Sequence, residues 1–261
     1  MPVDDSNLLI RTAKEFSLRT GLPLPGMRFQ VDQRIPVSRG LGSSAAAIVG
    51  GLVAANVVAD CPLTDDELFE IAVELEGHPD NVAAALFGGL VISVAGARHE
   101  PTLQSYIKLD VPCELQVVLA IPDFELATKV AREALPARVS MEDAVYNASR
   151  VGMFIACLSE RRFDLLSNAM EDALHQPYRS PLIPGFQDVV SAASRAGALG
   201  AALSGAGPSV LAFAEKGNAG PVAVAMGDAF RSHDIECKTI ITKGTSDGVK
   251  YSILPVKALP E

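Results

Sequence analysis

A glycine-rich stretch near the N-terminus has the composition of a phosphate-binding loop. It runs Pro36-Val37-Ser38-Arg39-Gly40-Leu41-Gly42-Ser43-Ser44 and leads into an apolar segment that we predict to be a helix over about residues 44–58. Gly40 and Gly42 can adopt positive φ, so successive backbone N–H groups can point into one concavity. The N-terminal amides and the positive dipole end of the helix would point to the same place. We therefore expect a cradle for nucleotide phosphates, although a serine-capped glycine turn before a buried helix would look the same.

A short polar stretch follows the next predicted helix. Glu76 stands at the end of that helix, and His78, Asp80 and Asn81 fall on the tight turn beside it, so all four could line one cleft. Mg²⁺ prefers oxygen ligands and takes one or two carboxylates from a protein. A bound cation would offset the unfavourable place of Glu76 at the negative end of a helix dipole. Taken alone, however, Glu76 is better explained as an exposed helix-end carboxylate, and the turn as a helix cap.

Helix and strand patterns surround these two stretches. Apolar residues at helical spacing predict a helix over about 6–19, and the capping-box sequence Thr64-Asp65-Asp66-Glu67 begins an amphipathic helix that Gly77 ends. Pro79 lies where the first turn of another short helix would start. Alternation of apolar and polar residues over 27–31 predicts a strand. Further strands are expected in the apolar segments LVISVA, YIKLDV and ELQVVLAI.

The second half of the chain mixes helices and strands, and we place a domain boundary near residues 110–115. A second glycine-rich loop, Gly200-Ala201-Ala202-Leu203-Ser204-Gly205-Ala206-Gly207-Pro208-Ser209, lies between two apolar strands. It could let the backbone approach a ligand, or it could be a tight turn between strands. Helices are predicted at about 140–160, 163–170, 186–196 and 219–232, and strands at about 198–203, 208–214, 235–242 and 249–254.

The composition predicts a soluble, cytoplasmic protein with neither nucleic acid nor a membrane as its partner. The 261 residues carry a formal net charge of −9, so an anionic ligand needs local help from backbone amides, arginine or a metal ion. The 4 cysteines are widely spaced and form no CxxC pair, which is typical of reduced thiols. The N-terminal sequence has no signal-peptide pattern, and the longest apolar run is too short to span a membrane.

Five separated segments together resemble one family. PVSRGLGSSAAAIVGGLVAAN is similar to the phosphate loop of the GHMP kinases, which include galactokinase and the homoserine, mevalonate and phosphomevalonate kinases. GALGAALSGAGPSVLAF is similar to the C-terminal glycine-rich segment of that family. The segments ELEGHPDNVAAALFGGLVIS, LATKVAREALP and LHQPYRSPLIPGF are most similar to the homoserine kinases. The resemblance extends over nearly the whole chain from about Ser6, and several motifs in this order are far more specific than any one alone.

The resemblance implies an α+β fold with two domains. We expect a ribosomal protein S5 domain 2-like, ATP-binding N-terminal domain over 1–112 and a ferredoxin-like C-terminal domain over 113–261. In homoserine kinases, a strand and a PATSANLGPGFD-type segment precede the place where this chain begins. The resemblance therefore implies an N-terminal domain without its first strands. A start assigned too far downstream, a shortened chain, or a chain that does not work alone would each give this pattern.

The resemblance also implies roles around ATP and Mg²⁺. Glu76 matches the metal-binding glutamate of the family, and the Ser44 hydroxyl would reach the metal or a phosphate oxygen, or would only cap its helix. Thr128 matches a threonine near the reacting centre, and with Asn81 it completes the expected catalytic set; its alternative role is to cap a helix. The residues expected to bind the nucleotide are Pro36, Arg39, Gly40, Leu41, Gly42, Ser43 and Ser44.

For the substrate, the resemblance implies an amino acid. Arg132 and Arg179 match the family arginines that grip the substrate carboxylate, a task that suits planar guanidinium groups. Asp80 would pair with the substrate ammonium group or act as a general base, beside His78 and Asn81, while Gly205 would let the backbone approach. The implied reaction is ATP-dependent phosphorylation of the L-homoserine hydroxyl, a step towards threonine, in an enzyme for which the family suggests a homodimer. The alternatives are another GHMP kinase, acting on a sugar or an isoprenoid alcohol, and a non-catalytic binding protein of this fold.

Overall fold

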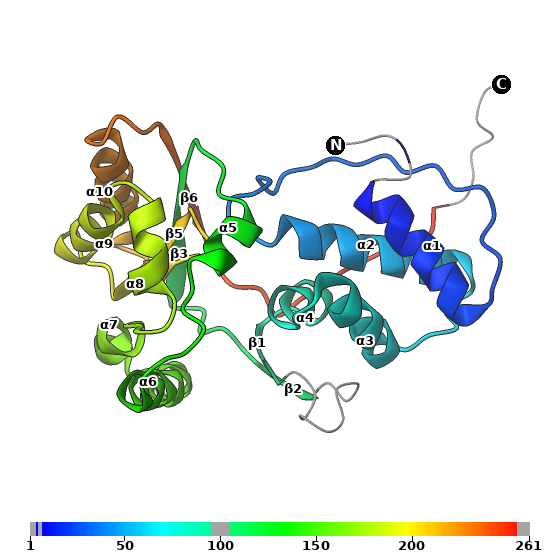
Figure 1. Cartoon of the computed structure of the whole chain (residues 1–261), viewed down its shortest axis with the longest axis horizontal. Helices are drawn as coiled ribbons and strands as arrows, with labels where there is room; N and C mark the ends of the chain where they lie inside the picture. The colour runs from blue at the N-terminus through cyan, green and yellow to red at the C-terminus, as the bar shows by residue number, and fades with distance from the viewer. Residues whose placement is uncertain (1–3, 5–6, 95–104, 255–261) are drawn as a thin grey trace. The chain divides into compact units, whose positions relative to one another are not determined.

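The computed structural model describes residue 4 and residues 7–94 and 105–254. Contacts divide the chain into two compact units (Figure 1). The first comprises Met1–Asp32, Ser44–Asp110 and Thr245–Glu261, and the second comprises Gln33–Ser43 and Val111–Gly244. Most of the glycine-rich loop therefore packs with residues from the C-terminal half. The family domain boundary between residues 112 and 113 stays a prediction, because these units are defined by contacts alone.

In its described part, the first unit has helices and one two-stranded antiparallel sheet as its regular elements. Its longest helix, rich in Ala and Val, is buried on most sides, which is typical of a core helix. At Gly51 of that helix, an added Cβ would lie 3.0 Å from the carbonyl oxygen of Leu9, so the missing side chain lets two helices pack closely. The elements are α1 (Leu8–Thr20), α2 (Ser43–Val58), α3 (Asp65–Glu76), α4 (Asp80–Phe87), β1 (Leu90–Val94) and β2 (Ser105–Leu109).

Two predicted strands are not formed. Residues 21–34 contain neither helix nor strand, although Phe29 packs against the core of the first unit. Residues 249–254 also contain no strand; the Val249 N–H donates to the carbonyl oxygen of Leu86 at 3.2 Å, but Ile253 and Leu254 are exposed. Alternating apolar residues indicate a half-buried extended segment, but a strand also needs a neighbour for its backbone groups.

Helix α3 begins and ends where the sequence predicts. The Thr64 hydroxyl accepts a hydrogen bond from the Glu67 N–H at 3.3 Å, and the Glu67 carboxylate accepts one from the Thr64 N–H at 2.8 Å. At the other end, Gly77 adopts φ 86° and stops the helix. Because only three residues separate α3 from α4, Glu76 and Asp80 are the last and first residues of consecutive helices.

The second unit is built on a four-stranded sheet with the order β4-β5-β3-β6, in which all neighbours are antiparallel. With α9 and α10, these strands follow each other as β-α-β-β-α-β, so the predicted ferredoxin-like arrangement is confirmed. Both helices pack against one face of the sheet (Figure 1). The elements are β3 (Leu115–Pro122), α5 (Thr128–Glu133), α6 (Met141–Ser159), α7 (Leu166–Ala169), α8 (Gln176–Arg179), α9 (Phe186–Arg195), β4 (Gly200–Leu203), β5 (Val210–Glu215), α10 (Ala219–Arg231) and β6 (Cys237–Thr242).

Two short helices of this unit are not predicted by any apolar repeat, although a helix capped by Thr128 was considered for the first of them. Helix α5 has 6 residues and α8 has 4, too few to show a repeat of apolar residues. The longer helices α6, α9 and α10 lie where they were predicted, within one residue at most ends. Across the described residues, no helix is long and apolar enough to cross a bilayer.

Candidate active site

The glycine-rich loop has the backbone that the sequence predicts. Gly40 and Gly42 adopt φ values of 72° and 74°, and Ser38 adopts 56°. Helix α2 starts at Ser43, so its first turn follows the loop directly. The loop and the helix end together are the arrangement in which backbone amides can bind phosphate groups.

The second glycine loop packs against the first. The Ser204 hydroxyl donates to the carbonyl oxygen of Gly40 at 2.9 Å, and the Ser209 N–H donates to that of Arg39 at 3.4 Å. An added Cβ at Gly40 would lie 2.2 Å from the Ser204 carbonyl oxygen and 2.8 Å from the Gly207 nitrogen. Glycine is therefore required at position 40 by the neighbouring loop, as well as by its positive φ. Both Gly205 and Gly207 also have positive φ, at 55° and 86°.

Two of the expected nucleotide-binding side chains already have partners in the second unit. The Arg39 side chain is only 13% exposed and lies 3.4 Å from an Asp123 oxygen and 3.7 Å from a Glu125 oxygen. The Ser43 hydroxyl accepts a hydrogen bond from the Gln33 side-chain amide at 3.1 Å. Arg39 therefore holds the loop against the residues that follow β3. Pro36 and Leu41 are half-buried in the same loop.

Within the first unit, Ser44 and Glu76 are brought together across 32 positions of sequence. The Ser44 hydroxyl donates to a Glu76 carboxylate oxygen at 2.7 Å. The carboxylate thus lies beside the first turn of α2, where the helix dipole favours negative charge, although it comes from the last residue of α3. A carboxylate beside a hydroxyl is a pair of hard oxygen ligands that fits Mg²⁺. Among the described residues, no group of three or more His, Cys, Asp or Glu side chains could hold a metal ion.

The turn after α3 forms a small network of its own. One Asp80 oxygen accepts from the Asn81 N–H at 2.8 Å and lies within hydrogen-bond distance of His78 Nδ1. The Asp80 side chain remains 72% exposed, whereas His78 and Asn81 are half-buried. His78 therefore orients Asp80, which remains accessible to a cationic group.

The expected carboxylate-binding arginines lie close together in the second unit. Arg179, on α8, donates from Nε to the Ala131 carbonyl oxygen at 3.1 Å, and Arg132 follows Ala131 in α5. A second Arg179 nitrogen donates to the Gly205 carbonyl oxygen at 3.2 Å. Burial lowers the pKa of Arg179, Asp172 opposes this shift, and the nearby charge of Arg132 adds to it. Two adjacent guanidinium groups favour an anion between them.

Helix α5 also carries Thr128. It is the first residue of the helix and is exposed; the capping position belongs to Ala127, which makes no side-chain capping hydrogen bond. Thr128 therefore does not act as the helix cap that was considered from sequence. Its hydroxyl lies one turn before Arg132, on the same short helix.

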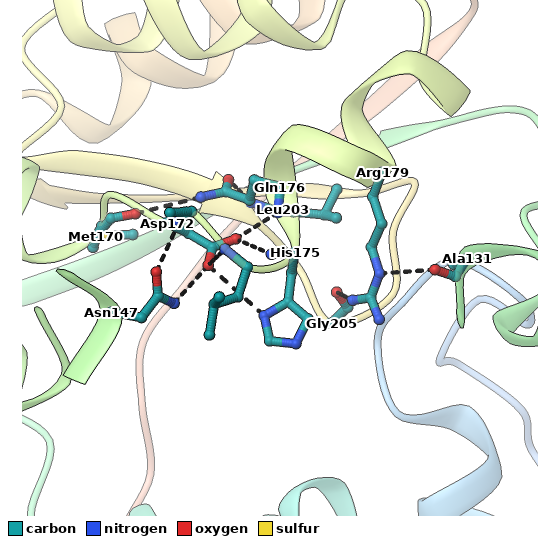
Figure 2. A network of polar contacts seen from close by, with 11 residues as sticks. Ala131, Asn147, Met170, Asp172, His175, Gln176, Arg179, Leu203 and Gly205 are labelled. Carbon is teal, nitrogen blue, oxygen red and sulfur yellow. Dashed lines mark hydrogen bonds and ion pairs between the residues drawn. The ribbon is translucent and has the colours of Figure 1, made fainter. Parts of the chain in front are cut away.

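Sequence reasoning missed the residues that hold α8. Asp172 and Asn147 bind the backbone before this helix, and Gln176 on α8 accepts from the Leu203 N–H of β4 at 2.9 Å (Figure 2). A short polar side chain a few residues before Gln176-Pro177 is a recognisable capping signal, because Asp and Asn often bind backbone N–H groups that follow them. Asn147 lies 25 positions earlier and gives no such local signal.

Comparisons with known proteins agree over most of the chain. Residues 7–89 match the GHMP kinases N terminal domain, and residues 154–232 match the GHMP kinases C terminal region. The homoserine kinase of Carboxydothermus hydrogenoformans is 46% identical over 252 residues, which cover 95% of this chain and 81% of that protein. The homoserine kinase of Moorella thermoacetica is 44% identical over 237 residues, or 91% of this chain and 78% of that protein.

A solved structure gives the same result. The crystal structure of homoserine kinase from Cytophaga hutchinsonii matches with a TM-score of 0.82 and 30% identity, over 95% of this chain and 79% of that one. Both family regions are present in order. The two homoserine kinases are more than 40% identical to this chain, and each alignment covers most of this chain and most of the relative. The chain, with its two-unit α+β fold, therefore belongs to the GHMP kinase family.

Proposed function

We propose that this chain transfers the γ-phosphoryl group of ATP to the side-chain hydroxyl of L-homoserine, giving ADP and O-phospho-L-homoserine on the way to threonine. The observation that carries the proposal is the pair of neighbouring arginines, Arg132 and Arg179, in a chain 46% identical to a homoserine kinase. Two guanidinium groups beside each other suit the carboxylate of an amino acid. A pocket for a sugar or an isoprenoid alcohol would have less need of both.

The nucleotide is assigned to the glycine loop and the start of α2. Phosphoryl transfer depends mainly on positioning and on neutralising charge at the phosphates. Backbone amides of the loop would bind phosphate oxygens, while Ser44 and Glu76 would hold Mg²⁺ through hard oxygen atoms 2.7 Å apart. When bound, Mg²⁺ neutralises charge on the phosphate oxygens. Arg39, already paired with Asp123 and Glu125, would then stabilise the loop and contribute little charge to the nucleotide.

The amino-acid substrate is assigned to two groups of residues. Arg132 and Arg179 would bind its carboxylate, and Asp80, oriented by His78, would bind its ammonium group. With both ends fixed, the hydroxyl oxygen forms a bond to the γ-phosphorus while the bond from that phosphorus to the β–γ bridging oxygen breaks; ADP leaves with the bridging oxygen, and the hydroxyl proton passes to water. We assign Asn81 and Thr128 to the catalytic set at the reacting centre. The loose character of this transition state places little demand on a base, so positioning is the role we favour for Asp80.

The proposal is tested by following ADP release from ATP and Mg²⁺ with L-homoserine, and by identifying the product by ³¹P NMR. Mevalonate and galactose are the comparison substrates. We expect ADP release that depends on L-homoserine, together with a phosphomonoester signal. Release with mevalonate or galactose but not with L-homoserine would identify another kinase of this family. No release and no ATP binding would favour a non-catalytic protein, and either result would overturn the proposal.

A further inference from the structure

The carboxylate of Asp172 binds the backbone that leads into α8. One of its oxygens accepts from the Asn147 side chain at 2.7 Å and from the Leu174 N–H at 2.9 Å. The other accepts from the His175 N–H at 2.8 Å and from the Gln176 N–H (Figure 2). The side chain is only 13% exposed. Burial raises the pKa of Asp172, but the His175 side chain, 3.8 Å away, and the hydrogen bonds from Gln176, Asn147 and Leu174 outweigh burial and hold the pKa well below its ordinary value.

Every backbone N–H from Ala173 to Gln176 is bound by a side chain. Asp172 accepts from the last three, and the Asn147 carbonyl oxygen accepts from the Ala173 N–H at 2.8 Å. Helix α8 is only 4 residues long, and a helix of that length has no stability of its own in water. Its direction is therefore set by the carboxylate and amide that bind its N-terminal side, not by its internal hydrogen bonds.

The same short segment ends in the expected carboxylate-binding arginine. Gln176 fixes its first residue to the end of β4, through the Leu203 N–H at 2.9 Å. Arg179 fixes its last residue to α5 and to the second glycine loop, through the carbonyl oxygens of Ala131 and Gly205. A rotation of α8 would displace the Arg179 guanidinium from both carbonyls at once. The path from Asp172 to Arg179 is thus a continuous set of backbone and side-chain contacts.

We infer that Asp172 is a positioning residue for Arg179, which it aims at the carboxylate of an amino-acid substrate by fixing the N-terminal side of α8. The inference rests on the proposed function for the identity of the substrate. It assigns Asp172 no contact with the substrate. Its effect is expected in substrate binding through Arg179 and not in ATP binding.

The first test is the Asp172→Asn variant. The amide keeps the shape of the side chain but has only one acceptor oxygen, whereas the four donors that surround Asp172 bind two carboxylate oxygens. We expect the KM for L-homoserine to rise about tenfold, with the KM for ATP changed less than about twofold. The matched control is Glu171→Gln, the same change at the adjacent position, because Glu171 binds Tyr146 and Arg150 of α6 and not α8. The inference would be contradicted if the KM for L-homoserine rose equally in Asp172→Asn and Glu171→Gln. It would also be contradicted if Asp172→Asn raised the KM values for L-homoserine and ATP equally.

A double-mutant cycle separates positioning from general stability. In the Arg179→Ala background, Asp172→Asn should raise the KM for L-homoserine by less than about twofold, because the group it positions is already absent. The same increase with and without Arg179 would show that Asp172 acts elsewhere. If Asp172→Asn does not fold, Asn147→Ser takes its place in the cycle, with the same expected direction and a smaller effect.

Amide hydrogen exchange tests the inference independently of any activity. The N–H groups of residues 173–176 should exchange faster in Asp172→Asn than in the unaltered chain or in Glu171→Gln. Unchanged exchange there would overturn the inference. Faster exchange in a chain that does not phosphorylate L-homoserine would instead uphold the positioning of α8 and overturn the proposed substrate.

Discussion

The Ser44–Glu76 pair of the first unit and the Asp172–Arg179 network of the second differ in how much structure depends on them. Ser44 and Glu76 meet through one hydrogen bond, and they come from helices of 16 and 12 residues, the second of which is capped by Thr64 and Gly77. Asp172 instead binds four donors, and a four-residue helix depends on it. We therefore expect that a substitution in the Ser44–Glu76 pair can remove its function and leave the helices in place. A substitution of Asp172, in contrast, should change the local fold and the position of Arg179 together.

The largest expected effect comes from Glu76→Gln, which removes the charge assigned to Mg²⁺ and leaves the helix ends intact. We expect kcat to fall on the order of 100-fold, as on removing one electrostatic group that acts on the transition state, with little change in the KM for L-homoserine. The melting temperature should not change. Glu74→Gln on the same helix is the control, because Glu74 pairs with Arg19. Full activity of Glu76→Gln at limiting Mg²⁺ would show that Glu76 is not the metal ligand.

Arg179→Ala should have the next largest effect and should act on substrate binding. Loss of a charge-assisted contact of about 2 kcal/mol raises the KM for L-homoserine roughly 30-fold. Arg179→Lys retains the charge but not the planar fork, so we expect only partial recovery. Arg195→Ala, at an exposed position at the end of α9, should match the unaltered chain. Steady-state kinetics with each substrate varied in turn would reveal a wrong assignment as a larger change in the KM for ATP.

The pH dependence of the free energy of unfolding should show the structural role of Asp172, which the Ser44–Glu76 pair does not share. The pKa of Asp172 is lowered by folding, so its stabilising effect is present above its unfolded pKa of about 3.9 and is lost as the pH falls towards the folded value. Below about pH 4, the free energy of unfolding should therefore fall less steeply for Asp172→Asn than for the unaltered chain. Urea unfolding at several pH values measures this. Parallel curves would mean that Asp172 contributes no such pH dependence.

The smallest effect concerns thiol labelling, which reports on each unit separately. Cys61 of the first unit and Cys113 of the second are exposed, whereas Cys157 is buried. Burial raises the pKa of Cys237 to about 11, so at pH 8 only about a thousandth of it is the reactive thiolate. We expect two rapidly labelled cysteines in the native protein, identified by mass spectrometry. Rapid labelling of Cys157 or Cys237 would indicate that the second unit opens readily.

The sequence predicts best those parts of the molecule that are long or locally capped. The α3 caps and the positive φ of Gly40 and Gly42 follow from a few neighbouring residues. The strand expected at 27–31 is absent because pairing depends on a neighbour, which an alternating pattern does not specify. Helices α5 and α8 are too short to show a repeat of apolar residues. The roles of Arg132 and Arg179 could therefore be inferred only through the family resemblance.

The candidate site shows the same division. The residue types indicated the phosphate cradle, and the family resemblance indicated the metal ligand. The structure places Ser44 beside Glu76. Asp172 escaped notice because an acidic residue in a loop is usually solvated. Its role depends on Asn147, on a helix 25 positions away, and on backbone donors that become available only when the chain turns into α8.

The contact between the two glycine loops also has a consequence for the order in which the protein forms during synthesis. The hydrogen bond from Ser204 to Gly40 spans 164 residues, and the space beside Gly40 is filled by backbone that is translated near the end of the chain. At the usual elongation rates, roughly 10 to 30 seconds separate the two loops. The loop assigned to the nucleotide thus stays without this packing partner until the second glycine loop has been made.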